Sequence, residues 1–293
     1  MEKILLAEVN ISEGTDLEKI NSIKDELMKN SELELVDLNS DKDHNRSVFT
    51  YKGTPEAVLE GTKRLSKKTI ELIDMRNHKG SHPRMGAIDV VPFIPVKNVS
   101  TGEAVKIAKE YGEYLGDLGV PVYFYEDAQE DPSRKSLVKI RKGQYEGLEE
   151  KINSRNLLPD VGPSKFNPKS GATVTGSRFV LLAFNINLDT EDLSSAKKVV
   201  QAIRGTKGGY KNVRAIALTL PDKKQVQISM NLINYEETPI HRVYETIKSE
   251  LDRYNINIVN SELVGPVPIY ALKELLSFYI KLEDKFSMEQ IYM

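Results

Sequence analysis

The sequence predicts a mixed α/β protein of two subdomains that share one order of elements: strand, helix, strand, strand, helix, strand. Short strand-like segments and longer amphipathic helical segments follow one another along the chain. The order found in the first half returns in the second half, without obvious sequence identity between the halves. The chain has 293 residues, of which 40% are hydrophobic, and this suffices for two ordinary domains with a sizeable core.

In the first half, a helix is predicted over Thr15–Asn30, because apolar residues share one of its faces and Thr15 with Glu18 is expected to form a capping box. The apolar face comprises Leu17, Ile20, Ile23 and Leu27. A second helix, Pro55–Ile73, has a proline in its first turn. The predicted strands are Lys3–Asn10, Glu32–Leu38, Arg46–Tyr51 and Ile88–Ile94. This is the split β-α-β order of ferredoxin-like units, and a helix over Thr101–Leu118 and a strand over Pro121–Tyr125 follow it.

The second half begins with a strong predicted strand, Phe179–Asn187, and repeats the same order. Its helices are Glu191–Arg204 and Pro239–Tyr254, and its further strands are Val213–Leu220, Gln225–Leu232 and Ile256–Leu263. Between the halves, Leu157–Arg178 carries three prolines and three glycines, too many for an interior element. We therefore expect an N-terminal subdomain over residues 1–178, a C-terminal subdomain over residues 179–293, and a ligand cleft that this connector lines.

Composition excludes several classes of protein. The formal net charge of −2 argues against a general nucleic-acid surface or anionic-membrane surface. Cysteine is absent, which removes disulfides, thiol nucleophiles and thiolate metal sites and suits a reducing cytosol. No apolar run approaches the length of a membrane span, and the N-terminus lacks a signal-peptide pattern. We expect a cytoplasmic protein that binds neither nucleic acid nor membrane.

Two of the four histidines, His78 and His82, lie in one segment rich in glycine, proline and cations. Gly80 and Pro83 oppose a continuous helix, so both histidines are expected on a turn. A zinc-protease motif would need a glutamate after the first histidine and an unbroken helix, so we predict no metal. A histidine with a pKa near neutrality can act as a proton shuttle. The residues alone leave open whether His78, His82 or neither is catalytic.

Three other polar segments allow a structural or a functional interpretation. Asn10–Gly14 ends the first strand, and it is either a turn into the helix or part of a ligand site at a strand end. The loop Asp41–Arg46 is either a charged hairpin loop or a ligand-facing loop. Gly162–Thr173 is either a flexible linker or a clamp for an anionic ligand through Lys165 and Lys169. It lacks the Gly-Lys-Ser/Thr ending of a P-loop, so a nucleoside triphosphate is not expected.

Several blocks of the sequence resemble the glutamate formiminotransferase family. They are Asn-Ile-Ser-Glu-Gly (10–14), Asp-His-Asn-Arg-Ser-Val-Phe-Thr (43–50), His-Pro-Arg-Met-Gly-Ala-Ile-Asp-Val-Val-Pro-Phe (82–93), Ile-Arg-Lys-Gly-Gln-Tyr-Glu-Gly-Leu (140–148), Gly-Ala-Thr-Val-Thr-Gly-Ser-Arg-Phe (171–179), Ala-Phe-Asn-Ile-Asn-Leu (183–188), Gln-Ile-Ser-Met-Asn-Leu (227–232) and Ser-Glu-Leu-Val-Gly (261–265). The matches run from residue 10 to about residue 272, nearly the whole chain.

The resemblance implies transfer of a formimino group between N-formimino-L-glutamate and tetrahydrofolate, giving L-glutamate and 5-formiminotetrahydrofolate, a late step of histidine breakdown. It implies a homodimer of two α/β subdomains with a folate tunnel between them, and a catalytic histidine in His-Pro-Arg, which is His82 here. It also implies a folate segment over Pro163–Ala172, where Ser170 replaces the tryptophan of other members. The chain is too short to include a cyclodeaminase domain, so the product would need a separate cyclodeaminase or another fate.

The expected folate contacts are Gly162, Pro163, Ser164, Lys165, Phe166, Asn167, Pro168, Lys169, Ser170, Gly171 and Ala172. The expected substrate contacts are Asn10, Asp43, His44, Asn45 and Arg84. Arg84 could hold a glutamate carboxylate through its planar fork or pair structurally with Asp89. Glu13, Asp43 and His44 are lesser candidates for orienting His82 as general acid and base.

Alternative functions from different classes of protein remain open. A close enzyme alternative keeps the folate but moves a formyl group, acting on N-formyl-glutamate or 5-formyltetrahydrofolate, and another acceptor such as glycine is also open. A non-catalytic amino-acid-binding regulatory protein is the second alternative. An RNA-binding role is disfavoured, because the paired aromatic strands of RNA-recognition modules are absent. The chemistry needs no nicotinamide, because folate itself carries the one-carbon unit.

Overall fold

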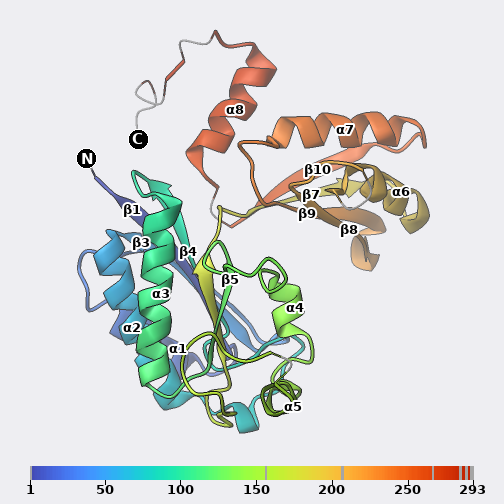
Figure 1. Cartoon of the computed structure of the whole chain (residues 1–293). Coiled ribbons are helices and arrows are strands. Elements are labelled where there is room, and N and C mark those ends of the chain that lie inside the picture. Colours follow the sequence, from blue (N-terminus) through green and yellow to red (C-terminus); the bar gives the residue numbers. More distant parts are fainter. Residues whose placement is uncertain are drawn as a thin grey trace. The chain divides into compact units, whose positions relative to one another are not determined.

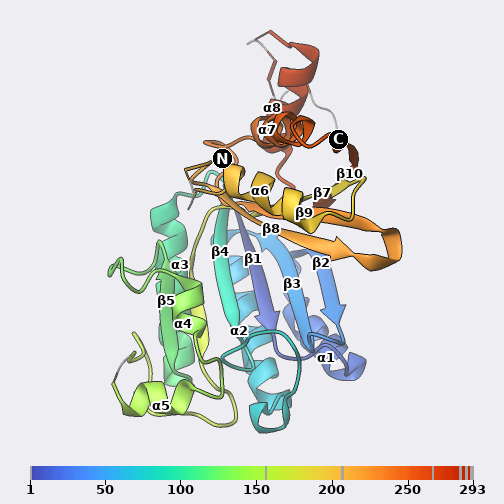
Figure 2. The same cartoon turned by 90° about the vertical axis from the view of Figure 1, so that its right-hand side faces the viewer.

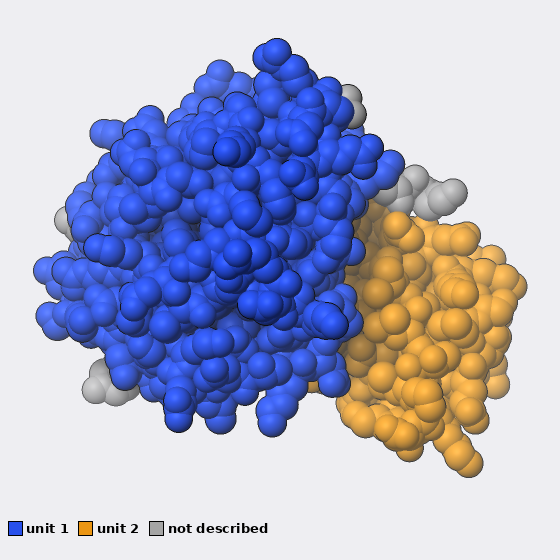
Figure 3. All heavy atoms as spheres, turned by 90° about the horizontal axis from the view of Figure 1, so that it is seen from below, with its two compact units in different colours: residues 1–178 blue, residues 179–293 orange. Residues whose placement is uncertain are grey.

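The computed structural model describes residues 2–155, 157–205, 208–265, 267–283, 286–287 and 290. The chain divides into two compact units, residues 1–178 and residues 179–293, which Figure 3 shows in separate colours. Each unit combines a β-sheet with helices, so the predicted mixed α/β class is confirmed (Figure 1). In the described part of the chain, no helix is both long and apolar enough to cross a membrane.

The first unit contains a six-stranded sheet. Its strands are β1 (Ile4–Ile11), β2 (Glu34–Asp41), β3 (Arg46–Gly53), β4 (Val90–Lys97), β5 (Val122–Glu126) and β6 (Thr173–Ser177), and its helices are α1 (Leu17–Leu27), α2 (Pro55–Leu72), α3 (Thr101–Asp117), α4 (Leu137–Arg141) and α5 (Leu148–Asn153). The order across the sheet is β2-β3-β1-β4-β6-β5, and Figure 2 shows these strands side by side. The pairs among β2, β3, β1 and β4 are antiparallel, whereas β6 pairs in parallel with both β4 and β5. The expected order of elements is therefore present, extended by two parallel strands.

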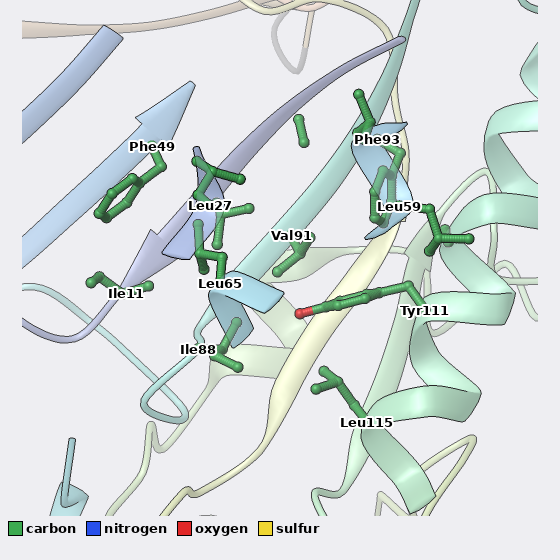
Figure 4. Close-up of a cluster of buried hydrophobic side chains, with 14 of the residues drawn as sticks. Ile11, Leu27, Phe49, Leu59, Leu65, Ile88, Val91, Phe93, Tyr111 and Leu115 are labelled. Carbon is green, nitrogen blue, oxygen red and sulfur yellow. The ribbon is translucent and has the colours of Figure 1, made fainter. Parts of the chain in front are cut away.

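Helices pack on both faces of this sheet, and each face has its own hydrophobic core. Residues from α1, α2 and α3 pack on one face, in a cluster that includes Leu27, Leu65 and Tyr111 (Figure 4). The short helices α4 and α5, which the sequence analysis did not identify, pack with Tyr123 and Val174 on the other face. Because side chains alternate along a strand, β4 and β5 contribute to both cores, and α3 and α4 lie on opposite sides of β5 (Figure 1).

Two details of the first unit correct the sequence analysis. Helix α1 is shorter than predicted, and it is capped by Asp16, whose side chain accepts hydrogen bonds from the backbone N–H groups of Glu18 and Lys19. The expected capping box of Thr15 with Glu18 is therefore wrong. Leu17 was expected on the buried face, but as the first helical residue it is 62% exposed.

Leu157–Arg178, which was expected as a connector at the end of residues 1–178, is an integral part of the first unit and not a linker. Its last residues form β6, which is fully buried between β4 and β5. The hydroxyls of Thr173 and Thr175 donate to the carbonyls of Ile88 and Val91, so these two buried side chains are satisfied, whereas the Ser177 hydroxyl has no hydrogen-bond partner among the described residues. The three prolines, Gly162 and Gly171 precede the strand, whereas Gly176 lies within it, and this high content of glycine and proline misled the prediction.

The second unit contains a four-stranded antiparallel sheet with the order β10-β7-β9-β8. Its strands are β7 (Leu182–Leu188), β8 (Val213–Leu220), β9 (Gln225–Leu232) and β10 (Ile258–Val264), and its helices are α6 (Leu193–Ile203), α7 (Ile240–Asp252) and α8 (Ile269–Ile280). Helix α8 was not predicted. The sheet and helices share one core that includes Ile186, Val199 and Ile247. The connections follow the predicted β-α-β-β-α-β order.

Candidate active site

The loop from His78 to Ala87, here called the His82 loop, lies against the turn that precedes β3. The backbone N–H of Ser81 donates to the carbonyl of Asp43 over 3.1 Å. The side-chain amide of Asn45 donates to the carbonyl of Lys79 over 2.7 Å. Two segments predicted separately to carry site residues are thus held together by hydrogen bonds between residues more than 30 positions apart in sequence.

The other end of the His82 loop is joined to the end of the predicted folate segment. The backbone N–H of Ala87 donates to the carbonyl of Ser170 over 2.8 Å, and that of Ala172 donates to the carbonyl of Met85 over 3.0 Å. Gly171 has a φ of +67°, and a Cβ there would lie 2.2 Å from the carbonyl oxygen of Met85. A glycine is therefore required at this junction.

His82 is half-buried on this loop and makes no hydrogen bond with any residue that the structure describes. Its ring faces the edge of the His44 ring, with 6.3 Å between the centroids. Burial and then the nearby charges of Arg46 and Arg141 lower the pKa of His82 to about 3. The imidazole is therefore neutral near pH 7 and has nitrogen lone-pair capacity to accept a proton.

His78, the other histidine of the loop, has both ring nitrogens occupied. Nε2 lies 2.9 Å from the carbonyl oxygen of Asn45, and Nδ1 accepts a hydrogen bond of 3.2 Å from Nε of Arg84. This pattern assigns the proton of the neutral ring to Nε2. Both ring nitrogens of His78 thus have partners within the protein, whereas those of the His82 ring have none among the described residues.

Arg84 is buried, and its guanidinium forms a two-pronged ion pair with Glu146, with N–O distances of 2.6 and 2.8 Å. The Arg84 hydrogen bond lowers the pKa of the Glu146 carboxyl. Asp89 pairs instead with Arg141 and accepts a hydrogen bond from the backbone N–H of Met85. The suggested structural pair of Arg84 with Asp89 is therefore wrong, because each has a different partner about 50 to 60 residues further along the chain.

Arg46 and Arg141 are site residues that the sequence analysis did not single out. Arg46 is the first residue of β3, and Arg141 is the last residue of α4. Both act on the charge state of His82. The signal was present in the sequence, because each arginine lies in a block that resembles the formiminotransferase family, at 43–50 and 140–148.

The remaining candidates of the first strand and its turn have mainly structural contacts. The carbonyl of Asn10 accepts from the backbone N–H of Asp89, and its side-chain amide donates to the carbonyl of Glu8. The carboxylate of Glu13 accepts from the backbone N–H groups of Thr15 and Asp16 at the start of α1. Glu13 therefore supports the helix and does not orient His82. The side chain of Asp43 is exposed, and its carbonyl accepts from the backbone of the His82 loop.

Some side chains of the predicted folate segment are exposed, whereas others contact neighbouring residues. Lys165 is exposed, whereas the Lys169 ammonium lies 3.4 Å from the carbonyl oxygen of Glu71. The rings of Phe166 and Tyr145 have centroids 5.5 Å apart and form a small aromatic surface. The segment itself is fixed by a hydrogen bond of 3.0 Å that the side-chain amide of Asn167 donates to the Gly119 carbonyl. It is thus an ordered part of the first unit and not a flexible linker.

Comparison with known proteins places both units in one family. The family model described as "Formiminotransferase domain, N-terminal subdomain" matches residues 4–178, and that described as "Formiminotransferase domain" matches residues 183–292. The glutamate formimidoyltransferase of Streptococcus pyogenes serotype M1 is 42% identical over 285 residues, which cover 97% of this chain and 95% of that protein. The glutamate formimidoyltransferase of Thermoplasma acidophilum is 41% identical, covering 93% of this chain and 91% of that protein. The formimidoyltransferase-cyclodeaminase of Rattus norvegicus is 42% identical over 96% of this chain, which spans only 53% of that protein.

Proposed function

The chain belongs to the formiminotransferase family, and on that premise we propose that it is a glutamate formimidoyltransferase that moves the formimino group between N-formimino-L-glutamate and tetrahydrofolate. The products are 5-formiminotetrahydrofolate and L-glutamate. The observation that carries this proposal is the match to named glutamate formimidoyltransferases over more than nine-tenths of both chains. The reaction belongs to one-carbon metabolism and to histidine degradation.

His82 is the proposed general acid and base. The folate supplies the attacking nitrogen and carries the one-carbon unit away. His82 is neutral before substrate binds, so its ring accepts the proton that the attacking nitrogen loses. The imidazolium then returns this proton to the departing amino nitrogen of glutamate. The proximity of the His82 loop to residues 170–172 supports this role, because their backbones are hydrogen-bonded to each other.

The segment Gly162–Ala172 is proposed to hold the folate. Phe166 and Tyr145 offer aromatic surface for a flat ring system. Lys165 offers an exposed cation for the carboxylates of the glutamate tail. Asn10, Asp43, His44 and Asn45 stay predicted substrate contacts, and Arg84 would have to release Glu146 to bind a carboxylate. That release is feasible because the Glu146 side chain is 63% exposed.

Several finer predictions belong to the same proposal. We propose a homodimer located in the cytoplasm, with residues 1–178 as the subdomain that holds His82 and residues 179–293 as the C-terminal subdomain. The chain spans about half of the length of the rat formimidoyltransferase-cyclodeaminase. A separate cyclodeaminase is the proposed partner that takes up the 5-formimino product.

Product analysis with two donors tests the function. N-formimino-L-glutamate and N-formyl-L-glutamate are each supplied with and without tetrahydrofolate, and with glycine in place of glutamate for the reverse reaction. The proposal expects folate-dependent release of glutamate from the formimino donor. Preference for the formyl donor would favour the formyltransferase alternative. Amino-acid binding without turnover of any donor would favour the regulatory alternative.

A further inference from the structure

Two arginines beside His82, here called the arginine pair, come from elements far apart in sequence. Arg46 begins β3 and Arg141 ends α4. Asp89, which directly precedes β4, is 1% exposed and forms a salt bridge with Arg141. Two permanent positive charges therefore lie close to one buried carboxylate and one neutral histidine.

The hydrogen-bonding capacity of the arginine pair is not used up by the protein. The Nε atoms of Arg46 and Arg141 are both buried, and neither has an acceptor among the described residues. Asp41 and Asp89 are near enough to stabilise the charge of Arg46, yet neither forms a salt bridge with it in the described part of the chain. Buried donors without acceptors are unfavourable, so their retention indicates that a ligand supplies the missing oxygens.

The local charge balance points to an anionic ligand. Burial, followed by repulsion from Arg141, lowers the pKa of Arg46. The permanent charges that act on His82 are those of Arg46 and Arg141, and His44 and His78 add to them only when they are protonated. All four disfavour an imidazolium at this position. An anion bound at the arginine pair would offset this positive field.

We propose that Arg46 and Arg141 bind the α-carboxylate of the glutamate portion of the substrate. This inference rests on the proposed function, in which the formimino group is attached to the α-nitrogen of glutamate. The α-carboxylate is only two bonds from that nitrogen, whereas the γ-carboxylate lies at the end of a flexible side chain. An α-carboxylate at the arginine pair therefore brings the reacting nitrogen next to His82. Planar guanidinium groups match a carboxylate through paired hydrogen bonds.

Binding and proton transfer are coupled in this arrangement. The α-carboxylate compensates the charges of Arg46 and Arg141, so the pKa of His82 rises when the substrate binds. His82 becomes a stronger base only when an amino-acid substrate is present. The arginine pair thereby acts as a specificity device for α-amino acid donors with a free carboxylate, and as a positioning device for the reacting nitrogen.

Titration by NMR tests the carboxylate site without turnover. The chain has only four histidines, and the His82 ring signals are identified by their absence in His82→Ala. L-glutamate and L-isoglutamine, whose α-carboxylate is an amide, are titrated into the full-length protein and into Arg46→Gln without folate. We expect wild type to bind L-glutamate roughly 10- to 100-fold more tightly than L-isoglutamine. Arg46→Gln should lose this preference and bind both ligands equally weakly.

The outcomes separate this inference from the proposed function. The α-carboxylate assignment would be overturned if Arg46→Gln lowered the affinity for L-glutamate and for L-isoglutamine by the same factor, so that the preference for L-glutamate remained. It would also be overturned if the affinity for L-glutamate did not change. Either result would count even if the enzyme turns over. Selective weakening supports the assignment even if His82 proves dispensable for turnover. Arg134→Gln is the matched control, because Arg134 already has a carboxylate partner, Asp160, at 2.9 Å. If Arg46→Gln lowers the melting temperature, Arg46→Lys replaces it, and an undiminished preference for L-glutamate in that variant would refute the paired geometry.

Discussion

Replacing His82 by alanine should remove most of the turnover and little of the stability. A positioned general acid and base contributes about two to four decades in rate, so kcat should fall by that amount. The His82 ring is half-buried and has no hydrogen bond to the described residues, so its removal leaves no partner unsatisfied. At neutral pH, the melting temperature of the variant should stay near that of the wild type.

The same variant should tolerate acid better than the wild type. His82 has a pKa of about 3 in the folded protein, below the value near 6.5 of an unfolded chain. As the pH falls below about 6.5, His82 binds a proton in the unfolded wild type but not in the folded state, so the free energy of unfolding decreases. At pH 5 this effect is at most about 2 kcal/mol, and solvent screening at a half-exposed group reduces it to about 1 kcal/mol. His82→Ala lacks this penalty, so its melting temperature at pH 5 should exceed that of the wild type by about 2 to 4 °C.

The assay combines steady-state turnover at pH 7 with thermal melts at pH 5 and pH 7. His78→Ala is the matched control, because it removes the other histidine of the loop. The His78 ring is hydrogen-bonded to Asn45 and Arg84, so His78→Ala should lower the melting temperature. Its turnover should fall less than that of His82→Ala. Near-normal turnover in His82→Ala would refute the catalytic assignment and make His78 or His44 the candidate. Identical acid sensitivity of the variant and the wild type would refute the electrostatic environment described for His82.

Three further predictions concern the folate segment and Arg84. Changing Lys165 and Lys169 together to alanine should raise KM for polyglutamylated tetrahydrofolate with little effect on kcat, and the effect should shrink at high salt because exposed charges are screened; an unchanged KM for mono- and polyglutamate forms would remove these lysines from the site. Arg84→Lys keeps the charge but loses the fork, so a binding role predicts a selective rise in KM for formimino-glutamate; a fall in melting temperature with both KM values altered would indicate a structural role instead. Gly171→Ala should destabilise the first unit by about 2 kcal/mol or more, because its φ is +67° and the new Cβ would meet the Met85 carbonyl; an unchanged melting temperature would contradict this.

The sequence alone determined the order of the elements and the choice of His82. The helix and strand patterns come from local periodicity, which depends on neighbours a few residues apart. Gly80 and Pro83 excluded a helix around the two histidines, and the block His-Pro-Arg selected His82 through resemblance to a family. The class of fold and the family followed from such short segments. The role of His82 in the reaction stays a prediction that the experiments above address.

Only the tertiary structure decided which charges meet and where residues 173–177 belong. The partners of Arg84 and Arg141 lie 62 and 52 positions away, and no local pattern encodes such pairs. The strand Thr173–Ser177 is buried because it fits between β4 and β5, a parallel pairing that depends on the whole sheet. Arg46 and Arg141 gained their importance in the same way, because burial left two guanidinium Nε atoms without acceptors among the described residues. Unmet hydrogen bonds arise only when the chain has folded and excluded water, and for that reason the proposed carboxylate site could not be inferred from sequence.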